Sequence, residues 1–375
     1  MLINRHYQIE KHLDPNKVVV IYGPRRVGKT TLVNEYLKKT KLRYRSDSGE
    51  NLEVQRILSS QDFDLIKDYV GNNQLVVIDE AQYIPNVGLG LKIIVDHIPG
   101  IKVIATGSSS FDLSGQVGEP LVGRKWTLNL YPLAQLELLG AYTISDLKHK
   151  LPEFLIFGGY PSVATARTKK AKRELLEELS QAYLLKDLLS LENVKSPQLL
   201  VDLLKLLALQ IGNEVSFNEL SNKLFIDIKT VERYLDLLEK TFVIFSLRGF
   251  ARNLRRTIRS KNKYFFYDNG IRNAVISQFN NLDSRNDVGQ LWENFLAVER
   301  LKKQEYKSIH ANNYFWRTWE GQEVDWAEER NGVLHGFEFK WGSGKKIKPP
   351  KDWAKAYHKT TFEVINRENY LDFLS

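Results

Sequence analysis

Residues 18–38 read VVVIYGPRRVGKTTLVNEYLK, and this stretch decides the fold of the first third of the chain. The apolar run Val18–Tyr22 predicts a buried strand, and TLVNEYLKK at 31–39 predicts a helix. The eight residues between them, at 23–30, match the pattern G-x-x-x-x-G-K-[ST] in full. Because the pattern also has the required strand before it and helix after it, the sequence predicts a phosphate-binding loop of the kind that holds ATP.

The chemistry of the loop follows from its residue types. Its glycines let backbone N–H groups turn toward phosphates, and the helix N-terminus adds the positive end of its dipole. Lys29 is expected to reach the β- and γ-phosphates, and the Thr30 hydroxyl to ligate Mg²⁺. The predicted nucleotide contacts are Gly23, Pro24, Arg25, Arg26, Val27, Gly28, Lys29, Thr30 and Thr31.

A second sequence element, which ends in two acidic residues, supports the assignment of a nucleotide site. The apolar run at 75–78 is followed directly by Asp79 and Glu80, which places two carboxylates at the end of a buried strand, where α/β sheets bind ligands. We expect Asp79 to hold Mg²⁺, directly or through water, and Glu80 to orient the attacking water as the catalytic carboxylate.

Two further positions have open interpretations. A third strand at 101–106 ends near Thr106 and Ser108, which are expected either to sense the γ-phosphate or simply to begin a loop. Arg124 is either a catalytic arginine finger or an ordinary surface arginine, and the sequence does not say whether it would act on its own nucleotide or on a neighbour's.

Composition narrows the class of protein. The chain has 375 residues, with 54 Lys and Arg against 45 Asp and Glu, a formal charge of +9 and a pI near 9.3. This balance is compatible with a nucleic-acid partner without requiring one. The absence of cysteine excludes disulfides and thiolate metal sites. No apolar run is long enough to cross a bilayer and no secretory leader is apparent, so we expect a cytoplasmic location and no membrane partner.

The pattern along the chain predicts several domains. Strands at 18–22, 75–78, 101–106 and 126–130 alternate with helices, which is typical of a parallel sheet with crossover helices. Residues 133–209 have a helical pattern, with amphipathic stretches at 174–191 and 197–209 and a loop at 157–161.

A helix–turn–helix pattern follows at 216–247. Ser216 and Glu219 form a capping-box pattern, and Asp227 can cap a second helix with Val231 and Leu238 on its apolar face. Strand-like runs at 242–247 and 264–267 complete a predicted winged-helix unit. The outer positions of the second helix carry both signs of charge, which fits a protein contact better than a DNA major groove: Lys229, Glu232, Arg233, Asp236 and Glu239.

The C-terminal part predicts a helix at 289–303, strands from 314 to 341 and then a basic tail. Asn331-Gly332 between two strand-like runs specifies a two-residue hairpin loop. Its register places Asp325 opposite Glu338 and Glu323 opposite Lys340. Strict alternation would put these four side chains on one face and Val324, Trp326, Phe337, Phe339 and Trp341 on the other.

Two directly opposed carboxylates repel each other unless positive charge lies between them. A divalent metal held by Asp325 and Glu338 would supply that charge, with Lys340 beside it to stabilise a developing phosphate charge. The alternatives are a plain Glu323–Lys340 ion pair with solvated Asp325 and Glu338, or a metal-free relic of a nuclease fold.

Motifs over nearly the whole chain carry a family resemblance: YGPRRVGKTTL, VVIDEAQ, ATGSSS, VGR, YPLAQLE and FGGYPSV. The chain resembles archaeal and bacterial AAA-type ATPases with a C-terminal domain of unknown function. The resemblance implies a P-loop parallel-sheet domain at 1–140, a helical and winged-helix domain at 141–270, and an α/β domain similar to PD-(D/E)xK nucleases at 271–375. It implies ATP and Mg²⁺ as cofactors, and a possible second divalent metal at the C-terminal site.

The nuclease resemblance assigns particular residues. Asp325 and the Glu338-Phe339-Lys340 triplet match the signature, and Glu293 on the preceding helix would be a further metal ligand. Val324 stands where the usual proline would be, although that position varies in such nucleases.

Basic residues are concentrated at 252–263, which has four arginines, two lysines and no acid. This run either grips DNA phosphates or is a solvated loop. A second basic cluster comprises Lys345, Lys346, Lys348 and Lys351. The favoured hypothesis is an ATPase whose nucleotide state controls a DNA-contacting C-terminal module, for which a metal-dependent nuclease is one candidate. The alternative is a regulatory or signalling ATPase switch with an inactive C-terminal module that binds a protein or a second copy of the chain.

Overall fold

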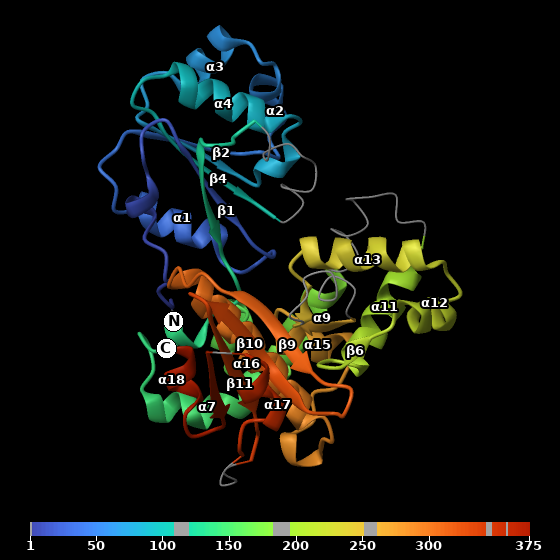
Figure 1. Ribbon diagram of the computed structural model, residues 1–375. Helices are drawn as coiled ribbons and strands as arrows, with labels where there is room; N and C mark the ends of the chain where they lie inside the picture. The colour runs from blue at the N-terminus through green and yellow to red at the C-terminus, as the bar shows by residue number, and fades with distance from the viewer. Residues whose placement is uncertain (1, 109–119, 183–195, 251–260, 343–346, 358) are drawn as a thin grey trace. The chain divides into compact units, whose positions relative to one another are not determined.

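The computed structural model describes residues 2–108, 120–182, 196–250, 261–342, 347–357 and 359–375 (Figure 1). These residues form two compact units. The N-terminal unit comprises Arg5–Tyr131 together with Lys240–Phe242. The C-terminal unit comprises residues 2–4, Pro132–Glu239 and Val243–Ser375.

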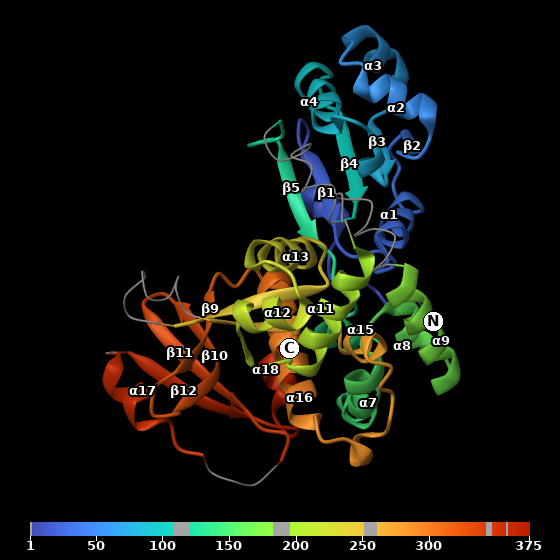
Figure 2. The same cartoon turned by 90° about the vertical axis from the view of Figure 1, so that its right-hand side faces the viewer.

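A five-stranded parallel sheet forms the centre of the N-terminal unit. Its order is β2-β3-β4-β1-β5, which Figure 2 shows from one edge to the other. The four predicted strands are confirmed. The strand β2 escaped prediction because its sequence, YRSDS, is polar, as suits an edge strand. The strands are β1 (Val18–Tyr22), β2 (Tyr44–Ser48), β3 (Leu75–Asp79), β4 (Lys102–Gly107) and β5 (Lys125–Asn129).

Helices enclose this sheet, whose inner strands are buried on both faces. The helices α2, α3 and α4 pack together and share one apolar core with β1, β3 and β4. The helix α1 follows the phosphate loop directly. The bounds are η1 (Ile9–His12), α1 (Lys29–Leu37), α2 (Leu52–Ser59), α3 (Phe63–Val70), η2 (Ala81–Tyr83) and α4 (Val87–His97).

The C-terminal unit contains one seven-stranded mixed sheet of order β12-β11-β10-β9-β7-β8-β6. The expected domain boundary at 270/271 falls within this unit, because β7 pairs with β9 in parallel and joins the two halves. The strands are β6 (Glu214–Val215), β7 (Ile244–Gly249), β8 (Asn262–Phe266), β9 (Asn312–Arg317), β10 (Glu323–Arg330), β11 (Val333–Phe339) and β12 (Thr360–Ile365).

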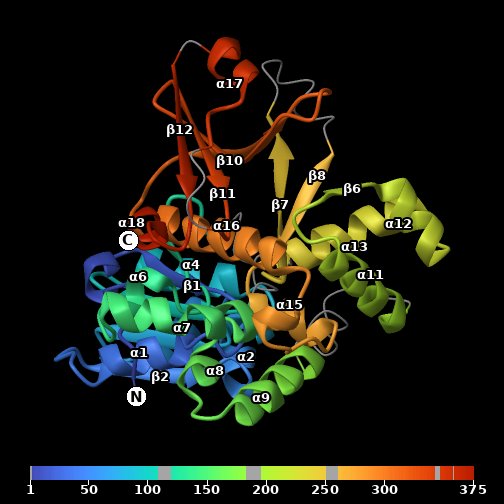
Figure 3. The same cartoon turned by 90° about the horizontal axis from the view of Figure 1, so that it is seen from below.

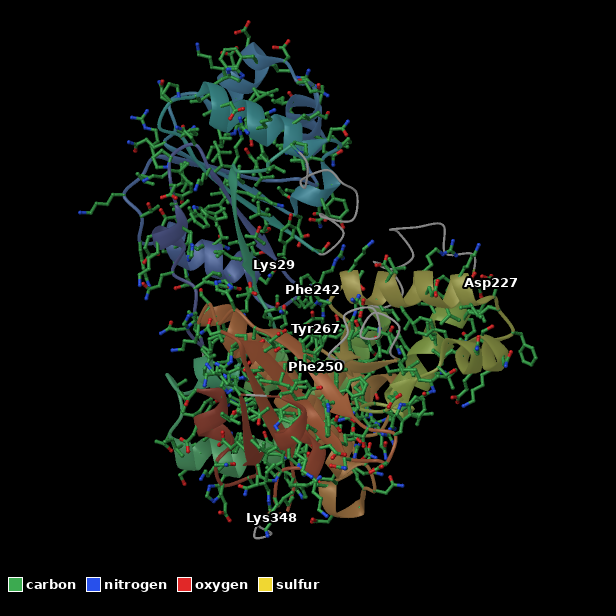
Figure 4. All side chains as sticks on the ribbon, viewed as in Figure 1. Lys29, Asp227, Phe242, Phe250, Tyr267 and Lys348 are labelled. Carbon is green, nitrogen blue, oxygen red and sulfur yellow. The ribbon has the colours of Figure 1, made fainter. Side chains whose placement is uncertain are left out.

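The predicted helical region is confirmed where it is described. Its helices are α6 (Gln135–Leu138), α7 (Ile144–Phe157), α8 (Pro161–Thr165), α9 (Lys169–Ala182) and α11 (Pro197–Leu209). The two helices of the helix–turn–helix pattern follow as α12 (Phe217–Leu224) and α13 (Ile228–Lys240). Ser216 accepts the Glu219 N–H at 3.4 Å and Asp227 accepts the Thr230 N–H at 2.9 Å, as expected of helix caps. Figure 4 marks Asp227 at the start of α13. Glu219 pairs with Lys223 at 2.6 Å.

A long helix, α16 (Val288–Tyr306), runs crosswise to the strands of the mixed sheet (Figure 3). Its Trp292, Phe295 and Leu296 belong to the largest apolar core, together with Trp326 and Phe337. The remaining elements are α15 (Asn269–Val275), η4 (Leu282–Ser284), α17 (Lys351–Ala356) and α18 (Tyr370–Leu374). The prediction of a basic tail is therefore wrong after residue 350. Here α17, β12 and α18 form, and their residues Trp353, Ile365 and Tyr370 are buried.

The hairpin of β10 and β11 has the predicted register, from Arg330 opposite Val333 to Trp326 opposite Phe337. Both turn residues, Asn331 and Gly332, have positive φ angles, 51° and 73°. The prediction that strict alternation continues to Glu323 is wrong. A bulge in the pairing with β9, between Val324 and Ala327, places Val324 in a separate core with Trp316, away from Trp326.

None of the helices in the described ranges is both long and apolar enough to cross a membrane.

Candidate functional site

The phosphate loop connects the buried strand β1 to α1, as predicted. Gly23 is required there because a Cβ atom at this position would lie 2.0 Å from the carbonyl oxygen of Leu130, and its φ is 152°. Arg26 is a non-glycine residue with a positive φ of 59°. Arg25 donates to the Tyr83 hydroxyl at 2.7 Å, which ties the loop to η2. The backbone is thus bent tightly against the segment that follows β5.

Lys29 begins α1, and its side chain is 4% exposed. Its Nζ donates to the carbonyl oxygens of Gly23 at 2.9 Å and Pro24 at 3.0 Å, so the ammonium lies against the loop itself. Figure 4 labels Lys29 at the N-terminal end of α1. A cation and a helix N-terminus therefore converge on the same short stretch of backbone, which favours a phosphate ligand.

Asp79 stands at the carboxyl end of β3 and is bonded by two hydroxyls. Thr30 Oγ1 donates to Asp79 Oδ2 at 2.9 Å, and Thr106 Oγ1 donates to Asp79 Oδ1. The sheet order explains this meeting, because β4 lies between β1 and β3 and all three strands end at one edge. Hydroxyl and carboxylate oxygens in contact at the phosphate loop are the donors that Mg²⁺ prefers, so Thr30 and Asp79 fit this ion.

Glu80 has a left-handed backbone, with φ 50° and ψ 44°, a strained conformation that is common at functional sites. Its N–H donates to Thr106 Oγ1 at 3.1 Å, and its carboxylate accepts a hydrogen bond from Gln82 Nε2. Gln82 Oε1 in turn accepts the Ser108 N–H at 3.3 Å. Gln82 thus links the carboxylate of Glu80 to the end of β4. Sequence reasoning missed this residue, although it follows Glu80 within the Asp-Glu-Ala-Gln stretch.

Arg124 lies just before β5, and its Nε donates to Asp96 Oδ1 at 2.5 Å. The side chain is 40% exposed, so this pair contributes little to stability. Its role as an arginine finger stays a prediction, as do the γ-phosphate contacts of Thr106 and Ser108.

The C-terminal unit gathers four carboxylates and two lysines. Lys263 of β8 is 3% exposed, and its Nζ contacts Glu323 Oε1 at 2.6 Å and Glu293 Oε1 at 3.2 Å. Burial lowers the pKa of the Lys263 ammonium, but the carboxylates of Glu293, Glu323 and Asp325 outweigh burial and raise it above its usual range. Burial raises the pKa of Glu293, so we regard Glu323, at the shorter distance, as the principal anionic partner of Lys263.

The other members lie where the β10–β11 ladder ends. Asp325 Oδ2 accepts the Phe339 N–H at 2.7 Å, and Lys340 Nζ contacts Glu338 Oε1 at 2.6 Å. Burial raises the pKa values of Asp325 and Glu338, and the charge of Asp325 raises the pKa of Glu338 further. The expected pairing of Glu323 with Lys340 is not observed. The bulge in β10 accompanies the contact of Glu323 with Lys263.

The arrangement of the side chains does not support the expected second metal site at Glu293, Asp325 and Glu338. Among the residues that the structure describes, no group of three or more Asp, Glu or His side chains is placed to hold a metal ion. The positive charge that the opposed carboxylates require comes from Lys263 and Lys340. Glu293, Asp325 and Glu338 therefore do not fit a divalent ion in this arrangement.

The basic stretches are only partly described. Arg252, Arg255, Arg256 and Arg259 lie outside the described residues, as do Lys345 and Lys346. Lys261 is exposed, whereas Lys263, expected in the same basic run, is buried in the carboxylate cluster. Lys348 and Lys351 are exposed, and so are four of the five outer positions of α13, Glu239 being half-buried.

The geometry of the loop, Asp79 and the parallel sheet agrees with the comparison to known families. Residues 15–139 match the AAA domain. This match suggests ATPase activity, and AAA ATPases generally use ATP and Mg²⁺. Residues 148–282 and 288–370 match two domains of unknown function, DUF8612 and DUF4143.

Similar proteins come from both bacteria and archaea. An uncharacterized protein of Haemophilus influenzae is 28% identical over 79% of this chain and 77% of its own length. An uncharacterized protein of Mycobacterium tuberculosis is 28% identical over 92% of this chain and 76% of its own. One of Methanocaldococcus jannaschii is 25% identical over 86% and 74%.

Proposed function

We propose that the protein hydrolyses ATP in its AAA domain and uses the nucleotide state to control its C-terminal unit. The observation that carries the first half is the convergence of Lys29, Thr30 and Thr106 on the phosphate loop and Asp79. In this scheme Lys29 exchanges its bonds to loop carbonyls for bonds to the β- and γ-phosphates. Thr30 and Asp79 hold Mg²⁺, which neutralises charge that develops on the transferring phosphoryl group.

Glu80 acts as the carboxylate that orients the attacking water and accepts its proton. To do so its carboxylate must leave the amide of Gln82, which also holds the Ser108 N–H. Gln82 is thus a positioning residue that connects Glu80 to β4, where Thr106 and Ser108 face the γ-phosphate in this proposal. Arg124 would leave Asp96 to act as the arginine finger.

The second half of the proposal is control of the C-terminal unit. It rests on a short segment of the chain that leaves the C-terminal unit and joins the N-terminal unit. Residues Lys240–Phe242, between α13 and β7, belong to the N-terminal unit. The ring of Phe242 meets that of Tyr131, just after β5, edge to face at 5.9 Å. If β5 moves when the nucleotide state changes, Tyr131 would move Phe242 and with it the short segment that separates α13 from β7.

The C-terminal unit serves as a recognition module in this proposal. The order α12, α13, β7 and β8 supports a winged-helix unit, and the basic run at 252–263 supports contact with DNA phosphates. Mixed charges on the exposed side of α13 support a protein partner, or a second copy of the chain, instead. Because Lys263 occupies the carboxylate cluster, we rank a catalytically inactive binding module first.

A metal-dependent nuclease is the second candidate function. One observation favours it: Asp325, Glu338 and Lys340 of the matching signature lie close enough to influence one another's pKa values.

Two assays on the purified protein distinguish the two candidate functions. One measures ATP hydrolysis, and the other measures cleavage of plasmid and linear DNA in Mg²⁺ or Mn²⁺. We expect ATP hydrolysis that Lys29→Ala abolishes, and DNA that stays intact. Cleavage that Asp325→Ala abolishes would establish the nuclease instead. No ATP hydrolysis by the unmodified chain would refute the first half of the proposal.

A further inference from the structure

We infer that Lys263 is the resident cation of the carboxylate cluster formed by Glu293, Glu323, Asp325 and Glu338, and that it closes this cluster to divalent metal. The inference concerns the C-terminal unit alone and does not depend on ATP hydrolysis.

The position of the ammonium is the first reason. Lys263 Nζ lies 2.6 Å from Glu323 and 3.2 Å from Glu293, which come from β10 and α16. The side chain extends from β8, whose backbone pairs with β7 through Lys263 and Leu247. A divalent ion bound by these carboxylates would stand within a few ångströms of a buried ammonium, at a large Coulomb cost.

The surroundings of Glu293 are the second reason. Its Oε1 faces Lys263, and its Oε2 faces the backbone of Gly212, in the loop between α11 and β6. A Cβ atom on Gly212 would lie 2.9 Å from Glu293 Oε2, so the backbone covers this oxygen closely. The Nζ of Lys263 also lies 5.2 Å from the ring centroid of Phe315, which stabilises a cation there. The carboxylate is thus enclosed by a lysine on one side and main chain on the other.

The charges of the remaining members are the third reason. Lys340 pairs with Oε1 of Glu338, and Oδ2 of Asp325 accepts the Phe339 amide, whereas Oε2 of Glu338 is buried without a hydrogen-bond partner among the described residues. The two ammonium groups balance two of the four acids. A cluster that lacked Lys263 would hold a larger excess of buried negative charge, which a divalent cation would relieve.

Mn²⁺ alone is the probe, added without nucleotide to the full chain in an Asp79→Asn background that removes the Mg²⁺ ligand of the AAA domain. Bound Mn²⁺ per chain is counted from the loss of the free-ion electron paramagnetic resonance signal. We expect Glu293→Gln and Asp325→Asn to leave this count unchanged. Lys263→Met should raise the count by about one, and adding Glu293→Gln should remove the gain. The exposed Lys348→Met is the matched control and should bind no additional ion.

Thermal unfolding gives a second readout. Lys263→Met should lower the melting temperature by about 6 °C or more, and Mn²⁺ should restore part of the loss only in this variant. If Asp325→Asn lowers the Mn²⁺ count in the presence of Lys263, the ammonium does not exclude the metal and the inference is wrong. It is equally wrong if a folded Lys263→Met chain binds no extra ion. If Lys263→Met does not fold, the Mn²⁺ counts of the chains with and without Asp325→Asn, both of which keep Lys263, test the inference by themselves. Every measurement is made without ATP, so failure of the ATPase proposal would not affect it.

Discussion

The hydroxyl of Thr30 and the carboxylate of Asp79 are 49 positions apart in the sequence and 2.9 Å apart in the structure. The contact joins the start of α1 to the end of β3, and β4 separates β3 from β1, the strand that leads into the loop before α1. In the proposed mechanism the nucleotide and Mg²⁺ share this pair of residues, which leads to the first prediction.

We expect Asp79→Asn to lower the rate of ATP hydrolysis at least about 100-fold, because the variant loses a charged ligand for Mg²⁺. Thr30→Ala should have a similar effect, whereas Asn34→Ala, at an exposed position of α1, should change the rate less than about threefold. Phosphate release at saturating ATP measures this. Equal activity of Thr30→Ala and Asn34→Ala would remove Thr30 from the metal site.

Glu80→Gln should separate binding from hydrolysis. We expect ATP affinity to remain within about threefold while the rate falls by about 100- to 10,000-fold, as for loss of a general base. Gln82→Ala should lower kcat by about tenfold with little change in KM, because it misplaces Glu80 without touching the phosphates. A Gln82→Ala enzyme with unchanged kcat and raised KM would assign Gln82 to binding instead.

Lys263→Met should cost about 2–4 kcal/mol of unfolding free energy, because it leaves the half-buried carboxylates of Glu293 and Glu323 without their cation. Lys348→Met, at an exposed position, should stay within about 0.5 kcal/mol. Urea unfolding in the absence of metal compares the two. Similar losses in both variants would show that Lys263 has no special role in the cluster.

Asp268 gives a pH dependence that does not involve the cluster. It caps α15 by accepting the Ile271 N–H at 3.1 Å, and it also accepts the Gly159 N–H at 2.7 Å. Burial raises its pKa from 3.8 to about 6, against the opposing effect of the Gly159 hydrogen bond and the charge of Lys302.

A folded-state pKa above the unfolded value means that the folded chain holds this proton more tightly. The contribution of Asp268 to stability is therefore complete below about pH 4 and is lost as the pH rises through about 6. We expect a decline of about 3 kcal/mol from this group, which Asp268→Asn should remove. If the unfolding free energies of the unmodified chain and of Asp268→Asn change with pH in the same way, the raised pKa of Asp268 is not the cause of the decline.

Phe242→Ala tests the coupling of the two units. We expect ATP hydrolysis to persist within about threefold, because the ring of Phe242 contacts Tyr131, which is not among the residues that bind phosphate or Mg²⁺ in the proposal. Any change that ATP causes in amide hydrogen exchange of β7 should disappear. An ATP response in β7 that survives this substitution would show that coupling takes another route.

Much of the nucleotide site was predictable because its residues are local to strand ends. The octet at 23–30 and the acids after 75–78 come with their own strand and helix patterns, and parallel strands align their carboxyl ends. Gln82 could not be assigned, because its partners, Glu80 and Ser108, meet only once β4 lies beside β3.

The C-terminal cluster shows where sequence reasoning stops. The Asn331-Gly332 turn fixed the register of β10 and β11 correctly over five pairs. The bulge before Ala327 depends on pairing with β9 and leaves no local sequence pattern, so the face of Val324 was predicted wrongly. Lys263 lies in a basic run, and its burial depends on acids 30 and 60 positions further along.

The threading of the chain also bears on its synthesis. Ile3 packs in the same core as Leu374, while Arg5–Tyr131 form the intervening AAA domain. A ribosome would therefore release a sheet able to fold, β1 to β5, long before the C-terminal unit could close around Ile3. Because Lys240–Phe242 also belong to the N-terminal unit, that unit is complete only after residue 242 has emerged. The core that contains both Ile3 and Leu374 can close only after residues 365–374 have been synthesised.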